Sequence, residues 1–148
     1  MKKIGSHTIK GKLISDSNAM EELTLFDGRF DTGYRVTFFE VSIANRVTTS
    51  TEVVSAKLAT EDVANNEIWD WGDNRELAWA AAGADANGIS TMTPQTIIDE
   101  DNMIIQDLYV GAYSYSDAEE INYLIKLDKY DISEWQGALA MVRNKSQG

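Results

Sequence analysis

Few residues of this 148-residue chain have types and spacings that could perform chemistry. His7 is the only histidine and there is no cysteine, which excludes a histidine-rich metal site and disfavours a Ser-His-Asp triad. The polar neighbours Ser6 and Thr8 favour an exposed, structural histidine. The sequence therefore offers no nucleophile–base pair around its one imidazole.

The acidic run 99–102 (DEDN) is the best candidate for a metal site. Its alternating oxygen ligands suit Ca²⁺, but the run lacks the glycine and the distal glutamate of an EF-hand loop. Acidic residues ahead of a strand also commonly form turns. We expect a turn here, with calcium as the alternative, and we assign no metal and no other cofactor to the chain.

Adjacent carboxylates such as Glu21 with Glu22 and Glu61 with Asp62 could suggest acid–base catalysis. Neighbours in a strand point to opposite faces, whereas glycosidase chemistry needs two carboxylates facing each other across a cleft. The glycines are isolated turn residues and form no phosphate-binding loop. We therefore expect no catalytic residues and a non-enzymatic protein.

Trp69 and Trp71 lie two residues apart in the polar loop 61–74. In an extended segment they would project to the same side, where aromatic faces can stack on sugar rings. Large aromatic residues also fill cores and interfaces. The pair is a candidate glycan- or partner-binding loop, together with the long glycine-containing loop 83–96, and a core or interface role is the alternative.

The net charge of the chain limits the kinds of molecule that it is expected to bind. The 13 basic and 24 acidic residues give a formal net charge of −11, which would repel the phosphates of a nucleic acid. Four of the lysines crowd into the first twelve residues and others lie near the C-terminus. These basic ends suggest docking onto acidic surfaces of neighbouring subunits, although charge also serves solubility. We expect no nucleic-acid partner.

No membrane span or secretion signal is expected in this chain. No segment approaches the roughly 20 apolar residues of a membrane-spanning helix, and the basic start lacks the apolar region of a signal peptide. The absence of cysteine fits synthesis in a reducing cytoplasm. We therefore expect no membrane partner.

Period-two alternation predicts a β-rich domain organised around the stretch 23–44, expected to be a β-hairpin. In its long strand the apolar face switches between Phe38 and Phe39, which predicts a β-bulge or a strand that crosses between sheets. Glu52 should lie at the exposed end of its strand. Further strands are predicted at 7–14, 51–60, 75–82, 103–115 and 121–130, the last two as an antiparallel hairpin.

After residue 131 the spacing of the apolar residues changes from every second residue to the three- and four-residue spacing of a helix. Ser133 followed by Gln136 is a capping-box pattern, and Trp135, Leu139 and Val142 form an apolar stripe. A lone short helix is marginal in water and needs a surface to lie on. We predict that the stripe is a subunit contact, with packing on its own domain as the alternative.

These patterns predict one all-β domain over residues 1–148. The expected architecture is an antiparallel β-sandwich or jelly-roll-like domain, with a short C-terminal helix or arm at 131–148.

Four motifs recur in a known family. They are LFDGRFDTGYRV at 25–36, a W-x-W loop at 69–71, a D-x-DN-x-I-x-x-DLY segment at 99–109, and the ending YDISEWQGALAMVRNKSQG at 130–148. The residues that carry the match are Asp27, Gly28, Phe30, Thr32, Gly33, Tyr34, Arg35, Trp69, Trp71, Asp101, Asn102, Asp107, Leu108, Tyr109, Tyr130, Asp131, Trp135 and Met141. Over nearly its whole length the chain resembles small proteins encoded by marine bacteriophages. The resemblance implies a phage origin and a structural role in the virion.

The sequence and the resemblance together lead to one main hypothesis. The chain is a non-enzymatic bacteriophage virion structural protein, a capsid decoration or cement protein that binds neighbouring capsid subunits and forms a homo-oligomer. It would be made in the host cytoplasm and reside in the virion. Two alternatives stay open: a receptor- or glycan-binding module of a tail or spike, and a small jelly-roll shell or vertex subunit.

Overall fold

A computed structural model describes residues 2–25, 28, 31–45, 51–63, 65–115 and 120–132. Throughout these residues the regular structure is β, without a helix. The strands are β1 (Lys2–Ile14), β2 (Glu21–Thr24), β3 (Thr32–Ile43), β4 (Glu52–Ala59), β5 (Glu76–Ala84), β6 (Gln95–Ile98), β7 (Asp107–Ser114) and β8 (Glu120–Asp131). The predicted all-β class is confirmed.

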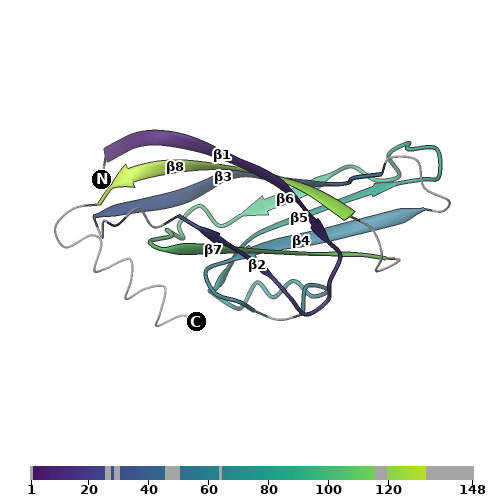
Figure 1. Cartoon of the computed structure of the whole chain (residues 1–148), viewed down its shortest axis with the longest axis horizontal. Coiled ribbons are helices and arrows are strands. Elements are labelled where there is room, and N and C mark those ends of the chain that lie inside the picture. The colour runs from purple at the N-terminus through teal and green to yellow at the C-terminus, as the bar shows by residue number, and fades with distance from the viewer. Residues whose placement is uncertain are drawn as a thin grey trace.

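The strands form two antiparallel sheets that pack face to face (Figure 1). One sheet has three strands in the order β1-β8-β3, and the other has five in the order β2-β7-β4-β5-β6. Side chains from both inner faces meet in one apolar core, in which Phe39, Leu58 and Ile125 are fully buried. Alternation of apolar and polar residues along each strand produces this arrangement, because successive side chains point to opposite faces.

Strand pairing is nested along the chain. The first strand pairs with the last (β1 with β8), the second with the seventh (β2 with β7), and the fourth with the fifth (β4 with β5). Strands β3 and β6 belong to different sheets, yet Thr96 Oγ1 of β6 donates a hydrogen bond to the Phe39 carbonyl oxygen of β3 at 2.9 Å. One lateral side of the sandwich is therefore closed by a contact between the third strand and the sixth.

The predicted irregularity in the central strand is present as a β-bulge. The register of β3 against β8 shifts between Val36 and Phe38, one residue before the predicted switch. Tyr34 and Val36 are buried before the bulge, and Phe39 and the following alternate residues are buried after it. Phe38 itself lies on the outer face, where Lys126 Nζ is 5.1 Å from its ring centroid.

Both predicted hairpins are wrong. Strands β2 and β3 lie in different sheets, so the stretch 23–44 crosses the sandwich instead of turning back on itself. Strands β7 and β8 are likewise split between the two sheets. Adjacency along the chain is the usual guide to pairing, but the nested topology places β2 and β3, and likewise β7 and β8, in opposite layers. Glu52 is also buried, contrary to the predicted exposed strand end.

The end of β8 is tied to the start of β3. The Ile132 amide donates to the Asp31 carbonyl oxygen at 2.7 Å, and buried Ile132 packs with Met103 and Ile105 in a second, smaller core. A Cβ on Gly33 would lie 2.6 Å from Met103 Sδ, so a side chain at this position would displace the methionine from its present packing. The folded domain thus extends to Ile132, past the predicted start of the C-terminal arm at residue 131.

The predicted C-terminal helix and its contact stripe of Trp135, Leu139 and Val142 lie outside the described residues. None of the described residues forms a helix with the length and apolar character needed to cross a membrane.

Candidate functional site

The loop between β4 and β5 covers the outer face of the five-stranded sheet, around a buried ion pair. Lys57 lies on that outer face, because its neighbours Ala56 and Leu58 point into the core. Its Nζ is 3.1 Å from Glu76 Oε2, and the two side chains are only 2% and 3% exposed. The same Nζ donates to the carbonyl oxygens of Asn65 and Ile68, each at 3.1 Å.

The carboxylate of Glu76 likewise has partners at both of its oxygens. Its Oε1 accepts hydrogen bonds from Trp79 Nε1 and from the Asp70 amide, each at 3.0 Å. A buried charge is tolerated only when it is paired and its remaining hydrogen-bonding capacity is used, and both conditions hold here. The Lys57–Glu76 pair therefore fixes the loop at three backbone points, namely the Asn65 and Ile68 carbonyls and the Asp70 amide.

A second anchor joins this loop to the connection between β1 and β2. The buried Asn66 side chain donates from Nδ2 to the Asp16 and Ala19 carbonyl oxygens, at 2.7 and 2.8 Å. It lies against Gly111 of β7, where an added Cβ would be 2.6 Å from Asn66 Cγ. The absence of a side chain at Gly111 is therefore what lets two distant loops meet above β7.

Arg75 closes the loop at its C-terminal end. Its Nε and Nη2 donate to the Asp73 carboxylate in a two-pronged pair, at 3.0 and 2.7 Å, and its Nη1 is 3.9 Å from Glu61. The hydrogen bonds from Arg75 hold the pKa of Asp73 below its usual value. Arg75 and Asp73, together with Asp62 and Asp70, line a polar pocket of about 280 Å³ above Lys57.

The candidate glycan-binding tryptophans have different environments. Trp71 is 62% exposed, and its ring packs at a tilt against Trp79 with centroids 5.9 Å apart. Trp69 is half-buried, and its Nε1 is buried without a hydrogen-bond partner in the described structure. The Asp73 amide donates to the Asp70 carbonyl oxygen at 3.2 Å, so this segment turns and is not extended. Trp71 is therefore the ring available to a ligand.

The segment 83–96 is more ordered than the sequence suggested. β5 continues to Ala84, and β6 begins at Gln95. Between them Asp85 closes a turn: its Oδ1 accepts from the amides of Asn87 and Ile89, at 2.9 and 3.0 Å. The segment is therefore a hairpin with a folded tip.

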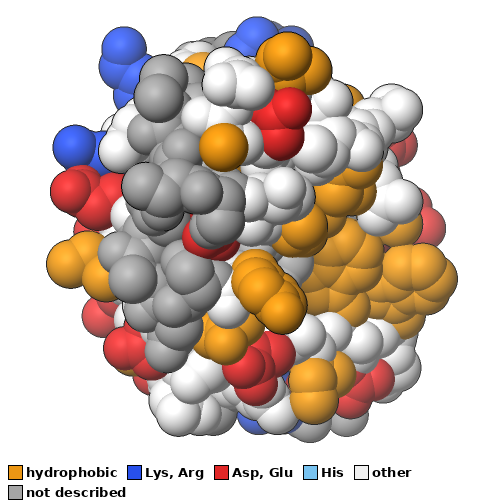
Figure 2. All heavy atoms as spheres, turned by 90° about the vertical axis from the view of Figure 1, so that its right-hand side faces the viewer, with side chains coloured by type: hydrophobic (Ala, Val, Ile, Leu, Met, Phe, Trp, Pro, Cys, Tyr) orange, Lys and Arg blue, Asp and Glu red, His pale blue; other side chains and the backbone are white. Residues whose placement is uncertain are grey.

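That tip belongs to an apolar end of the sandwich, where β4 begins and β7 ends. Figure 2 looks onto this end and shows hydrophobic side chains gathered on part of it. Exposed apolar residues of these strands and turns include Val53, Ile89 and Tyr115, the last 80% exposed. The Tyr115 amide donates to the Val53 carbonyl oxygen at 2.9 Å, so two of the three are held side by side.

The acidic run 99–102 forms the predicted turn. Asp99 Oδ1 accepts from the Asp101 amide at 3.2 Å, and Asn102 Nδ2 donates to the Asn74 carbonyl oxygen at 2.9 Å. Within the described part of the chain, no three His, Cys, Asp or Glu side chains gather where they could hold a metal ion. His7 is exposed, and its ring centroid lies 6.1 Å from that of Tyr34.

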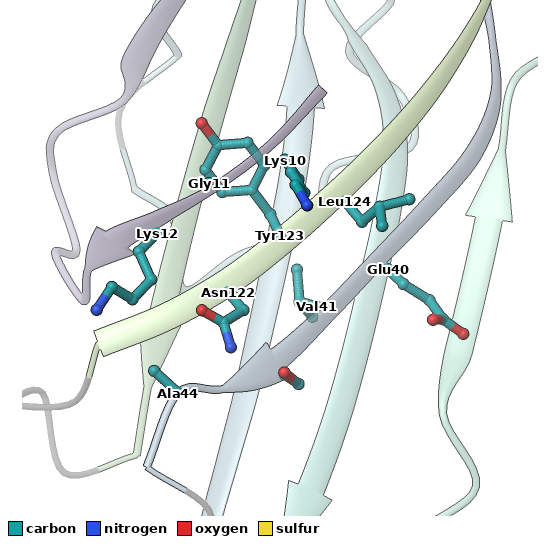
Figure 3. Close-up of a pocket in the computed structure, with 10 residues that line it drawn as sticks. Lys10, Gly11, Lys12, Glu40, Val41, Ala44, Asn122, Tyr123 and Leu124 are labelled. Carbon is teal, nitrogen blue, oxygen red and sulfur yellow. The ribbon is translucent and has the colours of Figure 1, made fainter. Parts of the chain in front are cut away.

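An open hollow of about 760 Å³ lies along the three-stranded sheet (Figure 3). Its lining comes from β1, β3 and β8 and includes Lys10, Lys12, Glu40 and Asn122. The ring of Tyr123 passes close to Gly11 of β1, where an added Cβ would be 2.7 Å from its hydroxyl. Burial, and then the nearby Glu21, raise the pKa of Tyr123.

Sequence reasoning missed the Lys57–Glu76 centre. The available signal was a single charged residue inside an apolar strand, since Lys57 stands between Ala56 and Leu58. An unpaired lysine at such a position is costly, which predicts a buried acidic partner. The sequence could not identify Glu76 as that partner, because β4 and β5 are joined by a long loop.

A comparison with models of known protein families gives no match, and a comparison with curated proteins gives none either.

Proposed function

We propose that this chain is a non-enzymatic structural protein of a bacteriophage virion, acting as a capsid decoration or cement protein. The observation that carries the proposal is the order of the strands. The sheets β1-β8-β3 and β2-β7-β4-β5-β6 contain three nested strand pairs, and β6 contacts β3 through a side-chain hydrogen bond although it is paired with β5. This order approaches that of a jelly roll, an architecture common in viral capsid and lectin domains, and it supports the proposal to that extent.

The resemblance to marine phage proteins supports the same role. Two residues of its motifs have structural roles: Gly33 leaves room for Met103, and Tyr34 exchanges two backbone hydrogen bonds with Ile104, each 2.8 Å long. Motif residues with such roles maintain the packing and pairing of the β-domain. This agrees with a repeated building block, which a virion uses in many copies.

Two surfaces would attach the protein to neighbouring subunits. The first is the apolar end with Val53, Ile89 and Tyr115, since exposed apolar patches mark protein–protein contacts. The second is the C-terminal segment 133–148, whose stripe of Trp135, Leu139 and Val142 remains a predicted contact. Partners would be capsid subunits and further copies of this chain.

Purified virions of the encoding phage test the role directly. Quantitative mass spectrometry should find the chain in a fixed ratio to the major capsid subunit, and imaging should place it on the outer shell. Confinement to tail fractions would refute decoration, and absence from purified particles would refute any virion role.

A truncation tests the C-terminal contact. Removing residues 133–148 keeps β8 and Ile132, so the β-domain should fold with unchanged circular dichroism. Binding to particles that lack the protein should then be lost. Unchanged binding would rule out the C-terminal contact, whereas loss of folding would show that the segment belongs to the domain core.

The second candidate function, a receptor- or glycan-binding module, is favoured by Trp71. An aromatic ring that is 62% exposed beside Asp70 and the Asp73–Arg75 pair resembles a sugar-stacking surface with polar groups at its margin. Glycan-array binding that disappears in Trp71→Ala would establish this function. Trp69→Ala provides the comparison, because a half-buried ring should affect binding only through the loop.

A further inference from the structure

The two lateral sides of the sandwich differ. On one side β3 contacts β5 and β6, so the sheets meet there. On the other side lie the outer edges of β1 and β2, and no strand pairing joins them within the described residues. Figure 1 shows β1 arching over the layer that contains β2 and β7. We call the side bounded by β1 and β2 the open side.

The two edges of the open side carry opposite charges. Strand β1 contains Lys2, Lys3, Lys10 and Lys12 and no acidic residue. Strand β2 is the short sequence Glu-Glu-Leu-Thr and contains no basic residue. A hydrogen bond with Asp107 of β7, and then repulsion by it, raise the pKa of Glu22, as expected where two carboxyl groups lie close together beside this edge.

Two of the four lysines of β1 form ion pairs with carboxylates of described residues. Lys3 and Lys12 form ion pairs with Asp128 and Glu120 of β8, at 3.2 and 3.1 Å. Lys2 and Lys10 are exposed, and neither makes an ion pair with any described residue. The β1 edge therefore keeps positive charge for a partner, in a chain whose overall charge is −11.

We propose that the open side binds a second copy of this chain through a two-fold axis, with β1 of each copy facing β2 of the other. A two-fold interface brings the same patch of both copies together, so that when one residue contacts another the reciprocal contact also forms. Here the two-fold rotation places the three-stranded sheet of one copy beside the five-stranded sheet of the other. Part of the basic edge of each copy then lies against Glu21 and Glu22 of its partner, the remaining lysines lie along the same seam, and two identical charge-complementary contacts form.

The alternative pairing of β1 with β1 is disfavoured by the same charges. Antiparallel alignment of two copies of β1 would bring the Lys2 end of one strand near the Lys12 end of the other. Like charges placed opposite each other across strands are destabilising, and lysines on an edge commonly block strand addition. The charge pattern of β1 thus opposes an extended fibre-like sheet and favours the contact with β2.

The open side is also long enough for a stable contact. Thirteen residues of β1 extend about 40 Å at roughly 3.3 Å per residue. Exposed Ile4 and Ile14 stand near its two ends and add apolar area to the charged edge. The inference deepens the proposed function by defining the contact between copies. Its test uses purified chain without any particle, so the two proposals can fail separately.

Charge reversal of either edge tests the arrangement. Lys2→Glu/Lys10→Glu makes both edges acidic, and Glu21→Lys/Glu22→Lys makes both basic. Each variant alone should dimerise at least tenfold more weakly than the natural chain in low salt, because like charges then meet. An equimolar mixture should restore dimers, since every contact again joins opposite charges. Lys126→Glu and Glu100→Lys are the matched controls, because Lys126 lies over Phe38 of β3 and the exposed Glu100 follows β6, on the closed side.

Sedimentation velocity gives the readout, with circular dichroism to show that each variant is folded. Two results would support the inference. The natural chain should sediment at twice its mass of 16.5 kDa and dissociate as the salt concentration rises. The two variants should each be monomeric alone and form dimers when they are mixed. A monomer at every concentration up to about 1 mM would overturn it. So would a dimer that is unaffected by both reversals, or an assembly larger than a dimer, which would replace the two-fold arrangement by a ring.

Discussion

Removing one partner of the Lys57–Glu76 pair should cost much of the stability of this domain. Lys57→Met keeps most of the apolar stem and deletes the charge, which leaves Glu76 buried opposite no cation. Breaking a buried pair in this way costs about 3–5 kcal/mol, out of about 5–15 kcal/mol for a typical domain. The Asn65 and Ile68 carbonyls lose their donor as well.

The double variant Lys57→Met/Glu76→Gln separates pairing from packing. It removes both charges, while the amide oxygen of the introduced glutamine can still accept the hydrogen bonds of Trp79 and the Asp70 amide. The loss should therefore be smaller than the sum of the single losses, by about 1–3 kcal/mol for groups in direct contact. Lys126→Met, on the exposed face of β8, is the matched control and should cost no more than about 1 kcal/mol, because it loses only an exposed contact with the Phe38 ring.

Equilibrium urea unfolding at pH 7 measures these differences as changes in midpoint at constant slope. Single losses below about 1 kcal/mol would contradict the reasoning, because a buried, fully satisfied pair cannot be removed that cheaply. Strict additivity in the double variant would also contradict it, by showing that the two side chains do not stabilise each other.

Two further changes test the second anchor and the ion pair that closes the loop. Gly111→Ala should destabilise the domain by about 1–3 kcal/mol, because the new Cβ collides with Asn66, and Asn66→Gly in the same chain should recover part of the loss. Gly5→Ala, where a Cβ meets nothing within 4 Å, should be nearly neutral, and equal effects at the two glycines would exclude the collision. The lowered pKa of Asp73 means that its pairing with Arg75 stabilises the fold above about pH 4 and is lost as pH falls through the folded-state pKa. Asp73→Asn should therefore reduce the free energy of unfolding at pH 7 and make it fall less steeply as the pH is lowered below about 4. An unchanged dependence on pH in that range would contradict the stabilising role of the Asp73–Arg75 pair.

The all-β class, five of the strands and the bulge could be predicted because each is a local pattern. Alternation along β3 and β8 shows which side chains face the core, and a change of phase marks the bulge in β3. The N-terminal half of β1 gave no such signal, since an edge strand with Lys2, Lys3 and Gly5 has no strictly apolar face. β6 is four residues long and mostly exposed, so it too lacked a pattern.

Strand pairing and the buried ion pair could not be predicted because they depend on contacts between distant segments. The pairing of β1 with β8 joins residues that are between 106 (Ile14 with Glu120) and 129 (Lys2 with Asp131) positions apart, and no local rule selects that partner. The same holds for Asn66, whose environment is set by Asp16, Ala19 and Gly111. A polar residue that is ordinary in sequence became fully buried only because three segments converge on it.

The pairing of the first strand with the last also constrains how this protein is made. On the ribosome, β1 emerges first but its partner β8 emerges last, so the three-stranded sheet cannot close until synthesis has passed Asp131. Until then the long basic strand is unpaired, and contacts of such wide sequence separation form slowly. Among the strands of this domain, β1 therefore waits longest for its partner. Its lysines would keep the waiting strand from aggregating with other nascent chains.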